Sequence, residues 1–124
     1  INEKELRHEF RDRKSDLKKL SKILSKNQKI ENLVVTSGKK GALLYNLKEK
    51  KFEYSDALAK KVIDKIGAGD SMLGLISLAL ASGIEKPLSL LIGSLAAAYS
   101  TENIANKDPI TKTKMLKGLL HLLK

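Results

Sequence analysis

The sequence predicts an α/β protein: a mostly parallel sheet with one hairpin, layered against helices and followed by a helical C-terminal part. Short β-branched runs alternate with helical patterns up to about residue 70. Beyond that point apolar residues recur at helical spacing almost to the end of the chain. The 124 residues are enough for one domain with a modest core, so 1–124 is predicted to be a single unit.

The first elements are a strand end and two helices. Ile1 and Asn2 are expected to end a strand, and residues 3–12 to start a helix on which Leu6 and Phe10 share a face. Residues 16–26 have leucines and isoleucine at helical spacing with lysines opposite, which predicts an amphipathic helix capped by Ser15. Residues 27–29 are expected to end it.

Three further segments predict strands. Residues 32–36 form a short β-branched run, which favours a buried parallel strand turned by Ser37 and Gly38. Residues 42–46 and 51–55 predict a hairpin with a polar tip at 47–50. A last short strand is expected at 61–63.

The C-terminal half predicts three helices. Residues 71–82 are apolar around most of the helix, which predicts burial on more than one side, and Gly83 suits a left-handed cap. Pro87 fits the first turn of a second helix that reaches about residue 102. Thr111 is expected to begin the last helix. Its inward residues are predicted to be Met115, Leu116, Leu119, Leu120 and Leu123.

Composition narrows the classes of function. There is no cysteine, hence no disulfide framework or thiolate metal site, and no apolar run reaches the length of a membrane span. The net charge of +10 raises nucleic acid as a partner. However, the lysines are dispersed, arginines are few and aromatic residues for base stacking are scarce, so a solvated lysine surface is the favoured interpretation. The expected location is cytoplasmic.

The segment 62–74 organises the rest of the chain. It leads from a β-branched run through two glycines, with Ala68 between them, into the apolar helix. Backbone N–H groups at a helix start lack partners, and glycines let an oxyanion approach them, so this arrangement predicts an anion site. Asp70 next to it is either a general base that accepts a proton from an attacking hydroxyl or only an acid of the first helical turn. The spacing alone leaves both open.

Three motifs in order resemble the ribokinase-like (PfkB) family of carbohydrate kinases. They are Asp-Lys-Ile-Gly-Ala-Gly-Asp-Ser-Met-Leu-Gly at 64–74, the strand and turn at 34–44, and Asn-Glu-Lys-Glu at 2–5. The resemblance implies the C-terminal part of a ribokinase-like αβα sandwich. Lys65 departs from the small or β-branched residue that the family usually has there.

The resemblance also implies roles for particular residues. Asp70 would be the general base, with Gly67, Ala68 and Gly69 as the anion hole. Thr36, Gly38 and Gly41 would line the nucleotide side, with Ser94 near the adenine. Asn2 and Glu5 would act through water on Mg²⁺ bound to the phosphates of ATP, the alternative being a helix cap with a first-turn acid. Asp64 and Ile66 would hold a monovalent cation such as K⁺.

The resemblance implies that a larger N-terminal part, with most of the sugar site, is missing from this stretch, so that the fragment is inactive alone. A narrower resemblance is to the kinase part of bacterial sugar kinase/nucleotidyltransferases of the heptose-phosphate kinase type. The expected partners are ATP and a sugar or sugar phosphate, and exposed apolar faces predict a homodimer or aggregate. Two alternatives are a catalytically silent nucleotide-binding or dimerisation module and a basic nucleic-acid-binding domain.

Overall fold

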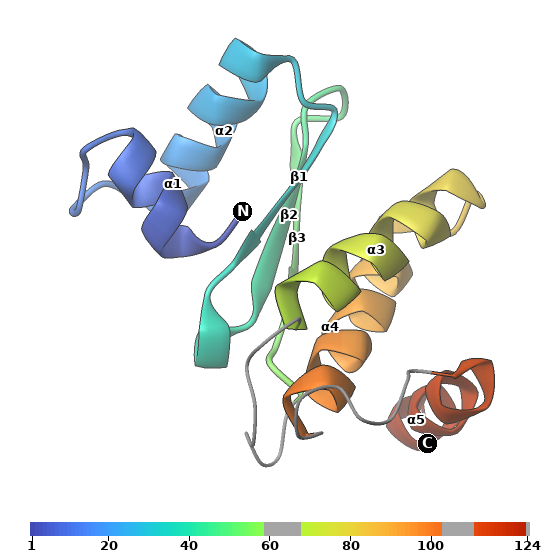
Figure 1. The fold of residues 1–124 in the computed structure, drawn as a ribbon. Helices are drawn as coiled ribbons and strands as arrows, with labels where there is room; N and C mark the ends of the chain where they lie inside the picture. Colours follow the sequence, from blue (N-terminus) through green and yellow to red (C-terminus); the bar gives the residue numbers. More distant parts are fainter. Residues whose placement is uncertain (59–67, 103–110, 124) are drawn as a thin grey trace.

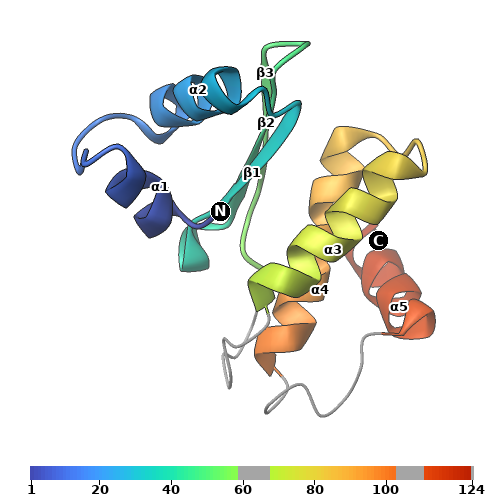
Figure 2. The same ribbon diagram turned by 45° about the horizontal axis from the view of Figure 1, so that its top comes forward.

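A computed structural model describes residues 1–58, 68–102 and 111–123 of the chain, which form three layers (Figure 1). Helices α1 (Glu3–Glu9) and α2 (Leu17–Gln28) cover one face of a small sheet. Helices α3 (Ala68–Ala81) and α4 (Lys86–Glu102) cover the other face, and α5 (Lys112–Leu123) packs outside α4 (Figure 2). The α/β class and the layered arrangement are therefore as predicted.

The sheet has the order β1-β2-β3, with β1 at Asn32–Thr36, β2 at Ala42–Asn46 and β3 at Lys51–Ser55. The predicted hairpin is confirmed by antiparallel pairing of β2 with β3. The prediction of a parallel strand at 32–36 is wrong for its pairing with β2, which is antiparallel. The connection 37–41 is too short for a parallel crossover. Among the described residues, β1 pairs in parallel only through a bridge between Asn2 and Thr36. The predicted strand at 61–63 lies outside the described residues.

Strand β1 is buried on both faces, which explains its unbroken apolar sequence. Leu33 and Val35 point toward α1 and α2 and pack with Leu6 and Leu20. Val34 points the opposite way and joins the cluster between the sheet and helices α3 and α4. The buried members of that cluster are Val34, Ala42, Leu44, Met72, Ile76 and Leu90.

Helices α3 and α4 run antiparallel and approach closely at Gly93 (Figure 2). A Cβ built on Gly93 would lie 2.6 Å from Cδ1 of Ile76 and 3.1 Å from Cγ of Met72. Only a glycine therefore fits at this crossing. The turn between the helices uses Gly83, whose φ of 80° confirms the predicted left-handed cap.

The N-terminal boundaries of two helices differ from the predictions. Helix α2 begins at Leu17 after Asp16, and Ser15 does not cap it. The Ser15 hydroxyl instead donates to the Asp12 carboxylate over 2.5 Å. Helix α3 begins at Ala68, earlier than the predicted residue 71, so the glycine-containing segment is already helical there.

The outer faces of α3 and α5 are more exposed than predicted. Leu73 and Leu78 of α3 are 54% and 62% exposed, so the predicted burial on more than one side is wrong here. On α5, Met115 is buried, but Leu116 and Leu120 are 50% and 61% exposed rather than inward. The α3–α4–α5 packing uses one face of each outer helix, and nothing among the described residues covers the other. The side chain of Leu123 lies outside the described part, and no helix in that part is long and apolar enough to cross a membrane.

Candidate active site

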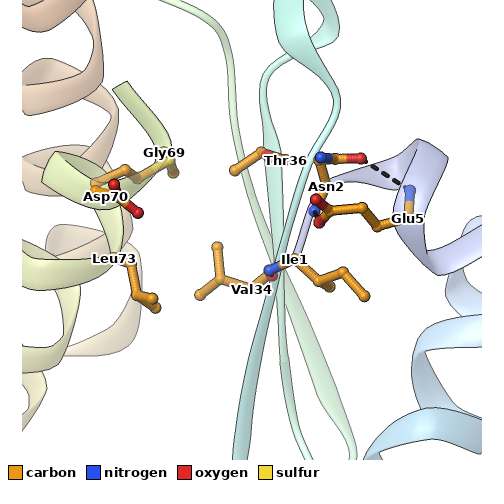
Figure 3. A pocket seen from close by; sticks show the side chains of 9 residues that line it. Ile1, Asn2, Glu5, Val34, Thr36, Gly69, Asp70 and Leu73 are labelled. Atoms are coloured by element: carbon orange, nitrogen blue, oxygen red, sulfur yellow. Dashed lines mark hydrogen bonds between the residues drawn. The ribbon is translucent and has the colours of Figure 1, made fainter. Parts of the chain in front are cut away.

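A pocket of about 300 Å³ lies where the N-terminal segment, β1 and the start of α3 meet (Figure 3). Its wall on the β1 side comes from the N-terminal segment and from the strand itself. The opposite wall is the first turns of α3. The pocket is lined by Ile1, Asn2, Glu5, Val34, Thr36, Gly69, Asp70, Met72 and Leu73. All three motifs identified in the sequence therefore contribute to one space.

Backbone pairing with β1 holds the N-terminal wall in place. The Ile1 nitrogen donates to the Val34 carbonyl over 3.2 Å, and the Thr36 N–H donates to the Ile1 carbonyl over 3.0 Å. These two bonds bring Asn2 to the end of β1, beside Thr36. The pairing explains why residues so far apart in the sequence share one wall.

Asn2 and Glu5 form a capping box at the start of α1. The Glu5 N–H donates to Oδ1 of Asn2 over 2.8 Å, and the Asn2 N–H donates to Oε2 of Glu5 over 3.0 Å (Figure 3). The helix-cap interpretation of this motif is thus present in the structure. It leaves Oε1 of Glu5 outside the capping box, so capping and a role in the pocket are compatible.

The other wall is the N-terminus of α3. In the described part of the chain α3 starts at Ala68, so the N–H groups of Ala68, Gly69 and Asp70 have no acceptor in the described turns of this helix. Gly69 and Asp70 are exposed, and a Cβ on Gly69 would meet no atom within 4 Å. Nothing among the described residues therefore blocks an anion from approaching these donors. Gly67, Asp64 and Ile66 lie outside the described residues.

The loop after β1 is shaped by two glycines with positive φ. Gly38 has φ of 56° and Gly41 has φ of 95°, and a Cβ on Gly41 would overlap the Ser55 carbonyl. The Tyr54 hydroxyl donates to the Lys40 carbonyl and ties the loop to β3. Of the residues predicted to lie on the nucleotide side, Thr36 lines the pocket, whereas Gly38 and Gly41 follow it in this loop.

Ser94 does not line the pocket. It is 5% exposed within α4, and its Oγ has no hydrogen-bond partner among the described residues. Its predicted position near an adenine stays a prediction.

Electrostatic interactions also connect α1 to the loop after β1. Two hydrogen bonds hold the pKa of the Glu3 carboxyl below its ordinary value, and the one from Arg7 has a larger effect than the one from Ser37. Arg7 Nε lies 2.9 Å from Oε1 of Glu3, and its Nη1 donates to the Ser15 carbonyl. Glu3 is thus occupied by protein partners, which leaves Glu5 as the acidic side chain of α1 that lines the pocket.

The oxygen donors of the pocket suit Mg²⁺ in composition. Asn2 supplies an amide oxygen, and Glu5 and Asp70 supply carboxylates. These hard ligands are the type that Mg²⁺ prefers, usually together with waters and substrate phosphates. In the part of the chain that the structure describes, no group of three acidic or histidine side chains could hold a metal by itself.

Sequence reasoning missed the apolar part of the pocket, which includes Val34 and Leu73. One signal was available for Val34. Residues two apart in a strand point to the same side, so Val34 had to share the side of Thr36. Leu73 carried no such signal, because it reads as an ordinary core position of an apolar helix.

Comparison with known proteins agrees with the three motifs. The family model described as "pfkB family carbohydrate kinase" matches residues 1–113. The chain is 30% identical over 105 residues to the bifunctional protein HldE of Koribacter versatilis. These residues make up 85% of this chain and 21% of that protein. This chain thus spans about a fifth of the length of that relative.

Solved structures show the same fold. Phosphofructokinase-2 from Escherichia coli, in complex with potassium, matches with a TM-score of 0.82 and 23% identity over 99% of this chain and 40% of that one. Ribokinase from Thermotoga maritima matches with a TM-score of 0.78 and 24% identity over 97% and 40%. The predicted ribokinase-like architecture is therefore confirmed. Because the family model matches residues 1–113 of the 124 in this chain, the chain belongs to the pfkB family of carbohydrate kinases.

Proposed function

We propose that this chain is the nucleotide-binding part of an ATP-dependent phosphotransferase that acts on a hydroxyl group of a sugar or sugar phosphate. One observation carries the proposal. Residues from all three motifs, namely Asn2, Glu5, Thr36, Gly69 and Asp70, line a single pocket. A phosphoryl-transfer site needs an anion-binding helix start, a carboxylate base and oxygens that orient the metal, and the residues of this pocket are of the types that these roles require.

In the proposed reaction Asp70 is the general base. Its exposed carboxylate accepts the proton of the substrate hydroxyl while that oxygen forms a bond to the γ-phosphorus. The bond from phosphorus to the β,γ-bridging oxygen breaks, and ADP leaves. The N–H groups of Ala68 and Gly69, in the first described turn of α3, stabilise negative charge on the transferred group. Phosphoryl transfer depends on this positioning more than on covalent catalysis.

Asn2 and Glu5 would direct water ligands of Mg²⁺ bound to the nucleotide phosphates. The ion, when bound, neutralises phosphate charge. A monovalent cation at Asp64 and Ile66 is also part of the proposal, and the similar phosphofructokinase-2 structure is a complex with potassium. Replacing K⁺ by a larger organic cation at constant ionic strength should weaken ATP binding if this site exists.

The central experiment compares Asp70→Asn with wild type in the complete native gene product. Asp70→Asn should keep its affinity for Mg·ATP in calorimetry and lose turnover by about 10²–10⁴-fold, because a general base contributes about that much. Gly69→Asp should abolish ATP binding, because the negative charge of the new side chain repels phosphate. A Cβ at this position meets no atom within 4 Å, so the substitution should not disturb the fold. Gly74→Asp is the matched control, because its Cβ also meets no atom within 4 Å and it does not line the pocket. Equal ATP affinity of Gly69→Asp and Gly74→Asp would refute the assignment.

A substrate panel tests the acceptor class. Heptose 7-phosphate, ribose, fructose 6-phosphate and nucleosides should be compared at equal concentration. The narrower sequence resemblance, to the heptose-phosphate kinase type, favours heptose 7-phosphate, and the chain is also similar to a bifunctional HldE protein. A higher kcat/KM for another acceptor would contradict it.

A silent nucleotide-binding or dimerisation module is the second candidate. It shares with the first candidate the pocket lined by Gly69 and Asp70, and it differs in having no phosphoryl transfer. On this alternative, ATP binds to the complete gene product and Gly69→Asp abolishes binding, but no acceptor in the panel is phosphorylated.

A further inference from the structure

A hydrogen bond joins the start of α3 to the end of α4. The hydroxyl of Ser100 donates to the hydroxyl of Ser71 over 2.8 Å. Ser100 is only 4% exposed, so little water competes for its proton. Ser71 directly follows Asp70, whose side chain lines the pocket. The bond therefore lies immediately behind the carboxylate.

The Asp70 carboxylate has no hydrogen-bond partner of its own among residues 1–58, 68–102 and 111–123. Figure 3 shows it on the α3 side of the pocket, reaching toward the β1 wall. Where it lies is consequently decided by the backbone of the first turn of α3. Anything that holds this turn also holds the carboxylate.

Among the described residues, two contacts with α4 hold that turn, one through Ser71 and one through Met72. Ser71 accepts the hydrogen bond from Ser100. Met72 is 3% exposed and packs at Gly93, where a Cβ would approach its Cγ to 3.1 Å. The packing contact sets the distance between the helices, but it has no preferred direction of its own. The hydrogen bond between Ser100 and Ser71 adds a directional contact at the pocket end of α3.

We infer that Ser100 is a positioning residue, which acts through Ser71 to hold the Asp70 carboxylate at its working position. The inference rests on the proposed function, in which Asp70 is the base. Neither the family motifs nor the pocket lining contains Ser100, which lies near the C-terminal end of α4.

The test uses Ser100→Ala, Ser71→Ala and the double variant in the complete native gene product. The matched control is Ser89→Ala, a fully buried serine of the same helix whose hydroxyl donates to the Ile84 carbonyl over 3.2 Å, far from the start of α3. Ser100→Ala should lower kcat about 3- to 10-fold with the KM for ATP unchanged, because misplacement of a catalytic group by about 1 Å costs up to about 10²-fold. Ser89→Ala should keep the wild-type kcat.

The double variant separates positioning from general loosening of the fold. If Ser100 acts through Ser71, the double variant should be no slower than Ser71→Ala alone. Losses that multiply, an unchanged kcat in Ser100→Ala, or an equal loss in Ser89→Ala would each overturn the inference.

A second measurement is independent of catalysis. Backbone amides of residues 68–72 should exchange hydrogen faster in Ser100→Ala than in wild type, and at the wild-type rate in Ser89→Ala. If wild type transfers no phosphate to any acceptor, the proposed function fails, and the exchange rates still decide whether Ser100 holds the turn. Unchanged exchange at 68–72 in Ser100→Ala would overturn the inference by itself.

Discussion

Gly93 lies where α4 crosses α3, and its replacement by alanine tests how closely the helix that carries Asp70 is packed. A Cβ at this position would lie 2.6 Å from Cδ1 of Ile76 and 3.1 Å from Cγ of Met72. Ile76 is 1% exposed and Met72 is 3% exposed, so neither side chain has room to move aside. Gly74 of α3 is the opposite case, because a Cβ there would meet no atom within 4 Å.

The two substitutions share one energy term and differ in another. Glycine to alanine inside a helix stabilises by about 1 kcal/mol at both positions, because alanine loses less conformational entropy. At Gly93 this gain is opposed by overpacking, which costs about 1–3 kcal/mol and belongs at the upper end against two buried side chains. We expect Gly93→Ala to lower the free energy of unfolding by about 2 kcal/mol and Gly74→Ala to raise it by about 1 kcal/mol, from these terms together.

Urea unfolding followed by far-ultraviolet circular dichroism measures both variants against wild type. The shared helix-propensity term cancels in the difference between the two variants, which should be about 3 kcal/mol and reports the crowding alone. If Gly93→Ala proves as stable as Gly74→Ala, the close α3–α4 approach is absent in solution. Met72 would then not hold the first turn of α3 against α4 either.

Three further outcomes are expected. Hydrogen bonds from the Ser15 hydroxyl and backbone, and from the Lys14 backbone, lower the pKa of Asp12 from 3.8 to about 2. Folding thus favours the deprotonated Asp12, and the stability that this contributes is present above pH 3.8 and is lost as the pH falls toward 2. In acid titrations of unfolding, the Asp12→Asn variant should have a lower free energy of unfolding than wild type at neutral pH. Its free energy of unfolding should also change less with pH between 3.8 and 2. Gly41→Ala should destabilise by more than about 2 kcal/mol in urea, since its φ of 95° is strained for alanine and its Cβ would overlap the Ser55 carbonyl; a smaller loss would mean that the loop after β1 rearranges freely. Leu78→Lys should reduce self-association in light scattering, because Leu78 is 62% exposed on an apolar helix face, and an unchanged particle size would exclude that face as the contact.

Much of the local structure was predictable from the sequence, because its signals are local. The hairpin 42–46 and 51–55, the cap at Gly83 and the extent of α4 each follow from turn chemistry or from helical spacing within a few residues. The predicted start of α3 at residue 71 is too late, because Gly69 favours a loop by its type but lies in the first turn of the helix. The cap of α2 was misassigned because Ser15 had a better partner in Asp12.

The convergence of the motifs was predictable only in part. The resemblance of three motifs to one family pointed to a shared site, and Asn2, Thr36 and Asp70 do line one pocket. That Asn2 reaches Thr36 through backbone pairing of Ile1 with β1 was not visible in the sequence, because hydrogen bonds between strands depend on register and not on residue type.

The sequence by itself determined the chemistry of this protein: a glycine-rich helix start beside a carboxylate, an Asn-x-x-Glu cap and a buried β-branched strand, each of which owes its properties to neighbours along the chain. Only the tertiary structure decided which way β1 pairs, which leucines of α3 and α5 face solvent, and that Ser100 reaches Ser71. The physical reason is the same in each case. Propensities and motifs act over one or two turns of chain, whereas pairing direction, burial and long-range hydrogen bonds depend on which segments pack together.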